Sequence, residues 1–284
     1  MNIKRLIYIA LLTPICFFGQ DDLLAEIDTV SADDYKAAAF KGLKIVNFES
    51  TKMVGQKELY FVVSHRFGSV KTGFEDFFGL DQAVTRLNFI YGVTDGINVG
   101  VSRSSFQKIY EGSLKLRLLR EKKGGFPFTV VSSNNILLNT ALDEVVLPGL
   151  TFENRLGYTA QLLISKKISE NLSLQLMPTF FHDNYVAIDE QHNSQYVMGF
   201  GGRQKLTKRF SLNFDYGLHL NRAETSPFRN SLSVGVDIET GGHVFQLHFT
   251  NAQPMNTNGF LGQGTGDWGS GDFFFGFNLS RVFN

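Results

Sequence analysis

The sequence predicts an all-β protein, an antiparallel up-and-down transmembrane β-barrel of about 12 strands with a short N-terminal extension. Three observations support this fold class: an N-terminus typical of exported proteins, strands that alternate apolar and polar residues, and a last strand rich in phenylalanine. Together they favour a barrel in the cell outer membrane over a soluble β-sandwich.

The composition suits β-structure. The chain has 284 residues, enough for one large β domain. Its 28 Phe, 28 Gly and only 6 Pro fit strands that are joined by tight turns. Lys plus Arg and Asp plus Glu both number 27, so the formal net charge is zero. We therefore expect no nucleic-acid partner, which would require a basic excess.

Residues 1–20 are predicted to be a cleaved signal peptide. Lys4 and Arg5 form a basic start, and the apolar run 6–18 is as long as a signal core but short for a bilayer span. The alternative is an N-terminal anchor helix. Cys16 is the single cysteine and lies inside this segment, so the mature chain would hold no disulfide and no thiolate metal site.

Residues 21–56 are predicted to form an N-terminal extension or plug. This stretch begins with acidic residues and continues through an alanine run, without the period of the later strands. We expect it either to lie inside the barrel or to add a partial strand. The barrel itself is assigned to residues 57–284, because no low-complexity linker divides the chain.

From about residue 57 the hydrophobic period becomes two. The clearest strands are 110–118, 151–165 and 210–221; in the last, every second residue from Phe210 to Leu220 is apolar. Strict alternation gives a strand one apolar and one polar face. Weaker copies fill most of the remaining chain, with roughly 9–14 residues per strand, enough to cross a membrane at a tilt. The period alone does not say which face is the inside.

The connections alternate between short and long, as in outer-membrane barrels. The predicted short turns are 94–96, 122–125, 169–171, 207–209 and 239–242. The predicted long loops are 68–81, 139–150, 183–193, 222–230 and 251–271. Asp-Gly and Gly-Gly pairs in the short turns tolerate the positive φ that tight hairpins require. A soluble sandwich also has many short strands, but its connections need not alternate in length.

The last strand, residues 273–283, carries phenylalanines on one face. Outer-membrane barrels commonly end in such a strand, whose terminal aromatic residue is recognised by the barrel-insertion machinery. We therefore expect this machinery and outer-membrane lipid as partners. Asn284, which follows Phe283, is a small departure from that pattern. The alternative is the edge strand of a sandwich, where an apolar free edge would promote aggregation.

Four motifs resemble an uncharacterised family of outer-membrane β-barrel proteins, a domain of unknown function from Gram-negative bacteria of the Bacteroidota type. The motifs are Ser-His-Arg-Phe-Gly at 64–68, Tyr-Gly-Val-Thr-Asp at 91–95, Gly-Phe-Gly-Gly-Arg at 199–203 and His-Val-Phe-Gln-Leu-His-Phe-Thr-Asn at 243–251. The resemblance covers nearly the whole mature chain. It implies a barrel and supplies no activity, so it assigns no functional residues.

The sequence contains no recognisable catalytic, cofactor or metal site, and we expect no enzyme and no cofactor. Ser64 and His65 are adjacent, so in a strand they point to opposite faces and cannot form a nucleophile–base pair. No Gly-x-Ser-x-Gly elbow is present. The glycines at 199–202 lack a following helix, so we interpret them as room for a bend in the wall or for a plug.

Polar side chains on the predicted inner face are the best functional candidates. The set is Arg86, Lys115, Arg117, Glu153, Arg155, Arg203, Asp215 and Asp237. Such residues either bond to one another across a narrow lumen or line a channel that selects a small solute. The sequence thus leaves open a narrow channel or small-solute binding and transport barrel, a structural or partner-binding barrel with a closed lumen, and a membrane-embedded hydrolase.

Overall fold

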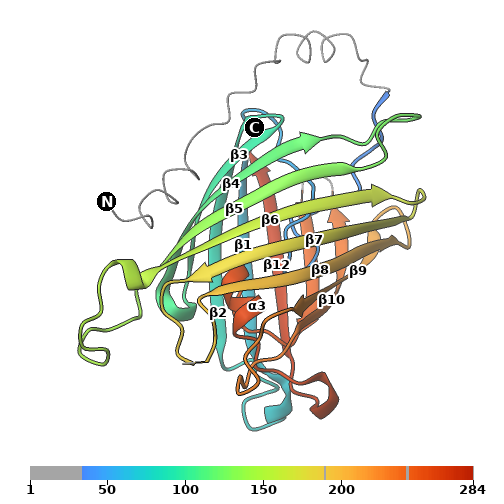
Figure 1. The fold of residues 1–284 in the computed structure, drawn as a ribbon. Coiled ribbons are helices and arrows are strands. Elements are labelled where there is room, and N and C mark those ends of the chain that lie inside the picture. Colours follow the sequence, from blue (N-terminus) through green and yellow to red (C-terminus); the bar gives the residue numbers. More distant parts are fainter. Residues whose placement is uncertain (1–33, 189, 241–242, 284) are drawn as a thin grey trace, which may run out of the picture. The chain divides into compact units, whose positions relative to one another are not determined.

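The structure is a computed structural model that describes residues 34–188, 190–240 and 243–283. In these residues twelve antiparallel strands form a closed barrel (Figure 1), which confirms the predicted fold class. The strands are β1 (Leu59–Ser69), β2 (Ala83–Thr94), β3 (Ile97–Ser104), β4 (Ile109–Leu119), β5 (Thr129–Asn139), β6 (Leu156–Lys167), β7 (Leu172–Asp183), β8 (Ser194–Lys205), β9 (Phe210–His219), β10 (Ser231–Thr240), β11 (His243–Thr250) and β12 (Phe274–Phe283). The predicted signal peptide lies outside the described residues.

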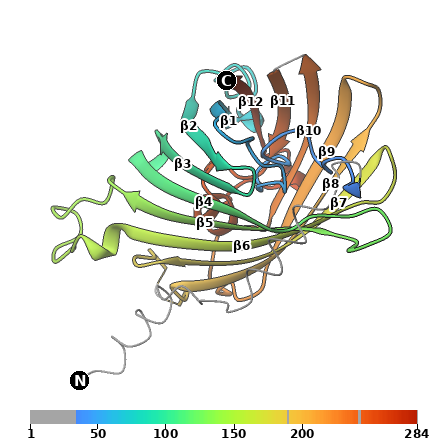
Figure 2. The ribbon, with the colours of Figure 1, turned by 90° about the horizontal axis from the view of Figure 1, so that it is seen from above.

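The barrel closes where the first strand pairs with the last. β1 and β12 are antiparallel, with Leu59 opposite Phe283 at one end and Ser69 opposite Phe274 at the other. Every other strand pairs with its sequence neighbours, so the topology is up-and-down (Figure 2). The Phe-rich C-terminal strand is therefore the closing strand and has no free edge.

The two faces of each strand separate cleanly. Apolar side chains such as Phe89 and Phe214, each 44% exposed, project from the outer face. The inner positions between them are buried and largely polar. This answers the question that the sequence period left open: the apolar face is the outside, as a membrane requires.

Short turns and long loops lie at opposite ends of the barrel, as predicted. The β2–β3 connection has two residues, 95–96, whereas residues 70–82, 140–155 and 251–273 form long loops at the other end. Two connections depart from this pattern: residues 105–108 at the long-loop end are short, and residues 120–128 at the short-turn end are longer than the predicted turn 122–125. β1 begins and β12 ends at the short-turn end. Among the described residues, no helix is long and apolar enough to cross a bilayer.

The predicted strand 151–165 is wrong at its start. Residues Glu153–Arg155 form the short 3-10 helix η4, and β6 begins only at Leu156. Asn154 causes the difference, because its side-chain oxygen accepts hydrogen bonds from the backbone N–H and hydroxyl of Thr151 at 2.8 and 3.0 Å. Local side-chain bonds of this kind hold a turn in competition with a strand.

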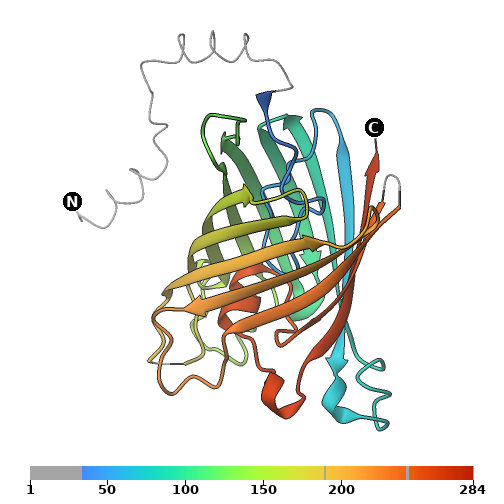
Figure 3. The ribbon, with the colours of Figure 1, turned by 90° about the vertical axis from the view of Figure 1, so that its right-hand side faces the viewer.

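Two segments occupy the interior of the barrel (Figure 3). The first, residues 36–56, is called the lumenal segment and belongs to the same compact unit as the strands. The second, residues 251–263, is called the inserted loop and contains the short helix α3 (Thr257–Gly262). Both contribute to one apolar core with inward residues of β5–β8, whose members are Ala39, Phe40, Ile45, Phe48, Met53, Val131, Leu163, Met177, Phe181, Val197, Ala252, Phe260 and Leu261.

The closed ladder predicts heat-modifiable electrophoresis. Folded protein in detergent should migrate as a compact species when it is not boiled and should shift to its full apparent mass after boiling, because the unbroken ladder resists detergent at room temperature. Identical mobility before and after boiling, together with recovery in the soluble fraction, would contradict the fold.

Candidate functional site

The lumenal segment folds into a small hairpin between Leu43 and Ser50. The N–H of Ser50 donates to the carbonyl of Leu43, and that of Ile45 donates to the carbonyl of Phe48, both at 2.8 Å. The ammonium of Lys44 donates to the carbonyl of Asn47 at 3.0 Å. These bonds leave the N–H groups at the tip without partners inside the hairpin. The barrel wall therefore has to supply acceptors for them.

Asp215 of β9 supplies the missing acceptor. One oxygen of its carboxylate accepts the N–H groups of Val46, Asn47 and Phe48 at 3.0, 2.7 and 3.1 Å. Successive backbone N–H groups that converge on one point form an anion-binding concavity, or nest. Here the anion belongs to the wall and the nest to the segment, so this contact anchors the hairpin.

Glycines in the wall make room for the hairpin. A Cβ on Gly199 would lie 2.7 Å from Cε1 of Phe48, and one on Gly201 would lie 2.7 Å from Cδ1 of Ile45. Both distances are too short for real carbon contacts, so only glycine admits these side chains. Of the two roles considered for this glycine run, the close approach of a plug is the one that Gly199 and Gly201 serve.

Arg66 of β1 connects the two segments inside the barrel. Its side chain is 1% exposed, and it donates to the carbonyls of Ala252 and Pro254 at 2.7 and 2.9 Å. Its other terminal nitrogen donates to the side-chain oxygen of Asn47 at 2.7 Å. The inserted loop and the hairpin are thus held by the same guanidinium, whose five donors suit several acceptors at once.

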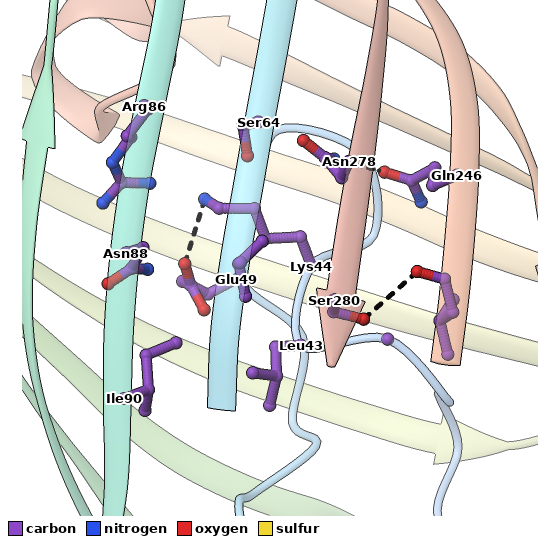
Figure 4. A pocket seen from close by; sticks show the side chains of 13 residues that line it. Leu43, Lys44, Glu49, Ser64, Arg86, Asn88, Ile90, Gln246, Asn278 and Ser280 are labelled. Carbon is purple, nitrogen blue, oxygen red and sulfur yellow. Dashed lines mark hydrogen bonds and ion pairs between the residues drawn. The ribbon is translucent and has the colours of Figure 1, made fainter. Parts of the chain in front are cut away.

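A second charged cluster lies beside the hairpin, and Figure 4 shows three of its members, Lys44, Glu49 and Arg86. Glu49 of the hairpin pairs with Lys44 at 2.9 Å and with Lys115 of β4 at 3.4 Å. Arg86 of β2 pairs with Glu111 of β4. Burial alone would raise the pKa of Glu49, but its attraction to Lys44 and Lys115 prevails and lowers that pKa to about 2.

Small cavities adjoin this cluster. Two of them, each with about 30 Å³ available to the centres of water molecules, share a lining that includes Glu49, Arg86 and Asn88. Each has room for one or two waters. A third of the same size lies nearer the long loops, between the inserted loop and the ends of β4–β7. The second cavity reaches Glu111, and the third reaches Ile109, the next inward position along β4.

Six of the eight predicted lumen residues face the interior. Asp215, Lys115 and Arg86 have the contacts given above. Arg203 pairs with Glu239 at 2.6 Å, and Asp237 accepts from Gln246 at 2.6 Å. Arg117 is a half-buried inward residue of β4.

Glu153 and Arg155 do not belong to the inner face. They lie in η4, in a long loop, where Glu153 is exposed and Arg155 donates to the carbonyl of Leu142. Their assignment to a strand is wrong, because the backbone turns before β6 begins. Arg155 nevertheless lines the third cavity, whereas Glu153 does not.

Sequence reasoning missed Arg66, Glu49 and Glu111. Arg66 and Glu111 occupy the polar phase of their strands, so the same alternation that selected Arg86 and Lys115 could have found them. Glu49 lies in a segment without regular period, and no sequence signal places it beside Lys115, which is 66 residues away.

Ser194 and His182 form the contact that a membrane-embedded hydrolase would need. The hydroxyl of Ser194 lies 2.9 Å from Nδ1 of His182, on the outer face at the long-loop end of β7 and β8. Among the contacts of the described residues, Nε2 of His182 has no acidic partner to orient the ring, which a triad requires. His65 instead contacts Thr85 Oγ1 at 2.9 Å and stacks on Phe277.

Comparison with known proteins agrees with a membrane barrel. A family model described as a membrane bound beta barrel domain (DUF5777) matches residues 40–283. The NanC porin structure is similar at 10% sequence identity over 78% of this chain and 98% of that chain, with a TM-score of 0.51. A search of curated proteins finds no match.

Two further solved structures are more distant in shape. The KdgM porin in complex with disordered oligogalacturonate is 7% identical over 80% of this chain and 99% of that chain, with a TM-score of 0.49. The outer membrane protein Omp33 of Acinetobacter baumannii is 10% identical over 81% and 100%, with a TM-score of 0.42. At such identities the likeness to the NanC porin shows the fold alone.

Asp215→Ala should loosen the hairpin. The substitution leaves three N–H groups without an acceptor, and hydrogen bonds to a charged group contribute about 1.5–3 kcal/mol each. We expect at least tenfold faster tryptic cleavage after Lys44 in the folded, heat-modifiable barrel. Asp215→Asn retains an acceptor oxygen, so its cleavage rate should lie between those of the wild type and Asp215→Ala. Glu144→Gln in an exposed loop is the control, and equal cleavage rates in all four proteins would contradict the anchor.

The depressed pKa of Glu49 predicts the pH range in which its ion pairs act. Because the pKa falls from 4.5 to about 2, these pairs stabilise the docked hairpin fully above about pH 5 and lose that effect as the pH falls through about 2. Hydrogen exchange of amides 46–50, corrected for intrinsic rates, should show a constant difference between wild type and Glu49→Gln from pH 7 to 5. That difference should vanish near pH 2; a loss already at pH 5 would refute the assignment.

Proposed function

Because this chain belongs to the membrane-bound β-barrel family DUF5777, the family predicted from its motifs, we propose that it is a narrow small-solute barrel whose passage the lumenal segment keeps closed. The barrel lies in the outer membrane, since closed antiparallel barrels with short turns at one end and long loops at the other are of that type. In this proposal residues 1–20 are a cleaved signal, 21–56 the plug and 57–284 the barrel, and the insertion machinery recognises the last strand.

The observation that carries the proposal is the asymmetry of the lumen. The apolar core lies against β5–β8, where Leu163 and Met177 are fully buried. The first two cavities adjoin β11, β12 and β1–β5, and the third continues to the ends of β4–β7. The second and third are separated by one inward position of β4, from Glu111 to Ile109. Successive inward positions are two residues, or about 7 Å, apart. Small movements of the plug would therefore join the second and third cavities.

The lining fits a small solute that has both polar and apolar parts. Asn88, Ser64 and Asn278 provide amide and hydroxyl groups around the first cavity, between charged groups of both signs. Polar and charged rings of this kind select solutes by charge and hydrogen bonding. An enzymatic role is not part of the proposal, because the Ser194–His182 contact lacks an orienting acid among the described residues.

The alternative is a barrel that stays closed and acts as a structural or partner-binding protein. The ion pairs of Glu49 with Lys115 and of Lys41 with Glu239, and the anchor at Asp215, favour it, because they hold the segment without any solute. The two functions differ in one measurable property: a closed barrel conducts no ions even when its plug is loosened.

Planar-bilayer recording tests the proposal. Wild type should be mostly closed, and Asp215→Ala should raise the open probability at least tenfold, in line with the loss of about 1.5–3 kcal/mol of anchoring per bond. Gly199→Leu, which pushes against Phe48 from the wall, should open the barrel independently. Glu144→Gln in the exposed β5–β6 loop should behave as wild type. Folded, heat-modifiable Asp215→Ala and Gly199→Leu proteins that carry no current would refute the channel.

A further inference from the structure

We propose that the cavity beside Glu49 is a binding site for a small carboxylate solute, and that Glu49 occupies it as an internal competitor which the solute displaces. The site is formed by Lys115 of the wall and Lys44 of the lumenal segment. The consequence for opening rests on the proposed channel function, whereas the binding itself does not.

Glu49 binds in the way that a free carboxylate would. Its two oxygens contact different ammonium groups, one at 2.9 Å from Lys44 and one at 3.4 Å from Lys115. Lys115 also donates to the carbonyl of Lys52 at 3.0 Å, and Lys44 to that of Asn47 at 3.0 Å. Both ammonium groups therefore keep a partner when Glu49 leaves, and both still have donors for an incoming anion.

The charge balance requires an anion at this place. The cluster holds three cations, Lys44, Lys115 and Arg86, against the two carboxylates of Glu49 and Glu111. Arg86 is bound to Glu111, so departure of Glu49 leaves two ammonium groups without a carboxylate. An uncompensated buried charge is strongly destabilising, which favours capture of an anion from solution.

Cations also lie on the approach from the short-turn end. Lys52 and Arg117 are half-buried there, and neither forms an ion pair within the part of the chain that the structure describes. A lumen with unpaired positive charge near its mouth concentrates anions.

The space fits a small molecule. Glu49 lines both cavities, and Figure 4 shows it beside Lys44 in the first, so withdrawal of its side chain would enlarge the space that they share. Leu43 and Ile90 give this space an apolar side, while Asn88 offers an amide. A carboxylate with a short carbon chain matches this lining and would replace the side chain of Glu49 nearly atom for atom.

Labelling of a buried cysteine tests the site without requiring current. Ala39 is 7% exposed in the core of the lumen, so Ala39→Cys in a Cys16→Ser background should react slowly with a water-soluble maleimide. The labelling rate is measured in sodium acetate, which is the probe. Sodium chloride at equal ionic strength is the reference, and sodium phosphate tests a second kind of anion. We expect acetate to raise the labelling rate at least threefold, and we expect this increase to saturate as the acetate concentration rises. Glu49→Gln should label fast without acetate.

Two variants separate the site from a general loosening. Lys115→Met should abolish the saturable acetate response, and Lys115→Arg should retain it, provided that both remain heat-modifiable. Glu239→Gln is the matched control, because Glu239 also pairs a wall arginine, Arg203, with a lysine of the lumenal segment, Lys41. It should respond to acetate as wild type does.

The outcomes distinguish the site from the channel. Equal effects of acetate and chloride, or an unchanged acetate response in Lys115→Met, would overturn the site even if Asp215→Ala conducts. A stronger response to phosphate than to acetate would overturn the assignment to carboxylates. A saturable acetate response that depends on Lys115, in a barrel that never carries current, would support the site and overturn the channel.

Discussion

The structure depends on one constraint: a bilayer offers no hydrogen-bond partner to the backbone, so every strand in it has to be paired on both sides. Pairing of β1 with β12 meets this requirement by closing the ladder. Closure then determines where the two faces of each strand lie. Because side chains alternate along a strand, one set faces the lipid and the other faces a narrow interior. The exposed phenylalanines outside and the buried polar groups inside follow from this single condition.

The polar interior in turn determines what can fill it. The lumenal segment is mostly irregular, so its backbone groups need partners that a strand would have found in its neighbour. Side chains of the wall provide these partners. Asp215 accepts hydrogen bonds from three N–H groups. The side chain of Asn98 accepts from the N–H of Val54 at 2.9 Å and donates to its carbonyl at 3.0 Å. The wall thus supplies hydrogen-bond partners to backbone groups of the segment that would otherwise be buried without any.

The fold could be predicted from the sequence because it rests on local patterns. Each of these patterns lies within about a dozen residues: the alternation along β9, the tight-turn residues between β2 and β3, and the aromatic residues of β12. Inward residues such as Asp215 and Lys115 follow from the same alternation. Their partners do not, because Asp215 meets Asn47 across 168 positions of sequence, and no period relates a wall strand to an irregular segment. Glu153 and Arg155 were misplaced because the side chain of Asn154 forms a local turn, which overrides alternation.

The contacts of the hairpin fall into two kinds, and the difference decides how it could move. At the tip, three backbone donors converge on Asp215, and a solute cannot imitate them, because the donors belong to the hairpin itself. At the base, Gln175 holds the backbone of Glu49 and Thr51, and Lys115 donates to the carbonyl of Lys52. The side chain of Glu49 is the flexible contact there, and a small carboxylate can take its position at Lys115. A solute therefore acts on the base while the tip stays bound. Motion of the segment, where it occurs, would begin at Glu49 and pivot on Asp215, on the side of the lumen where the cavities already lie.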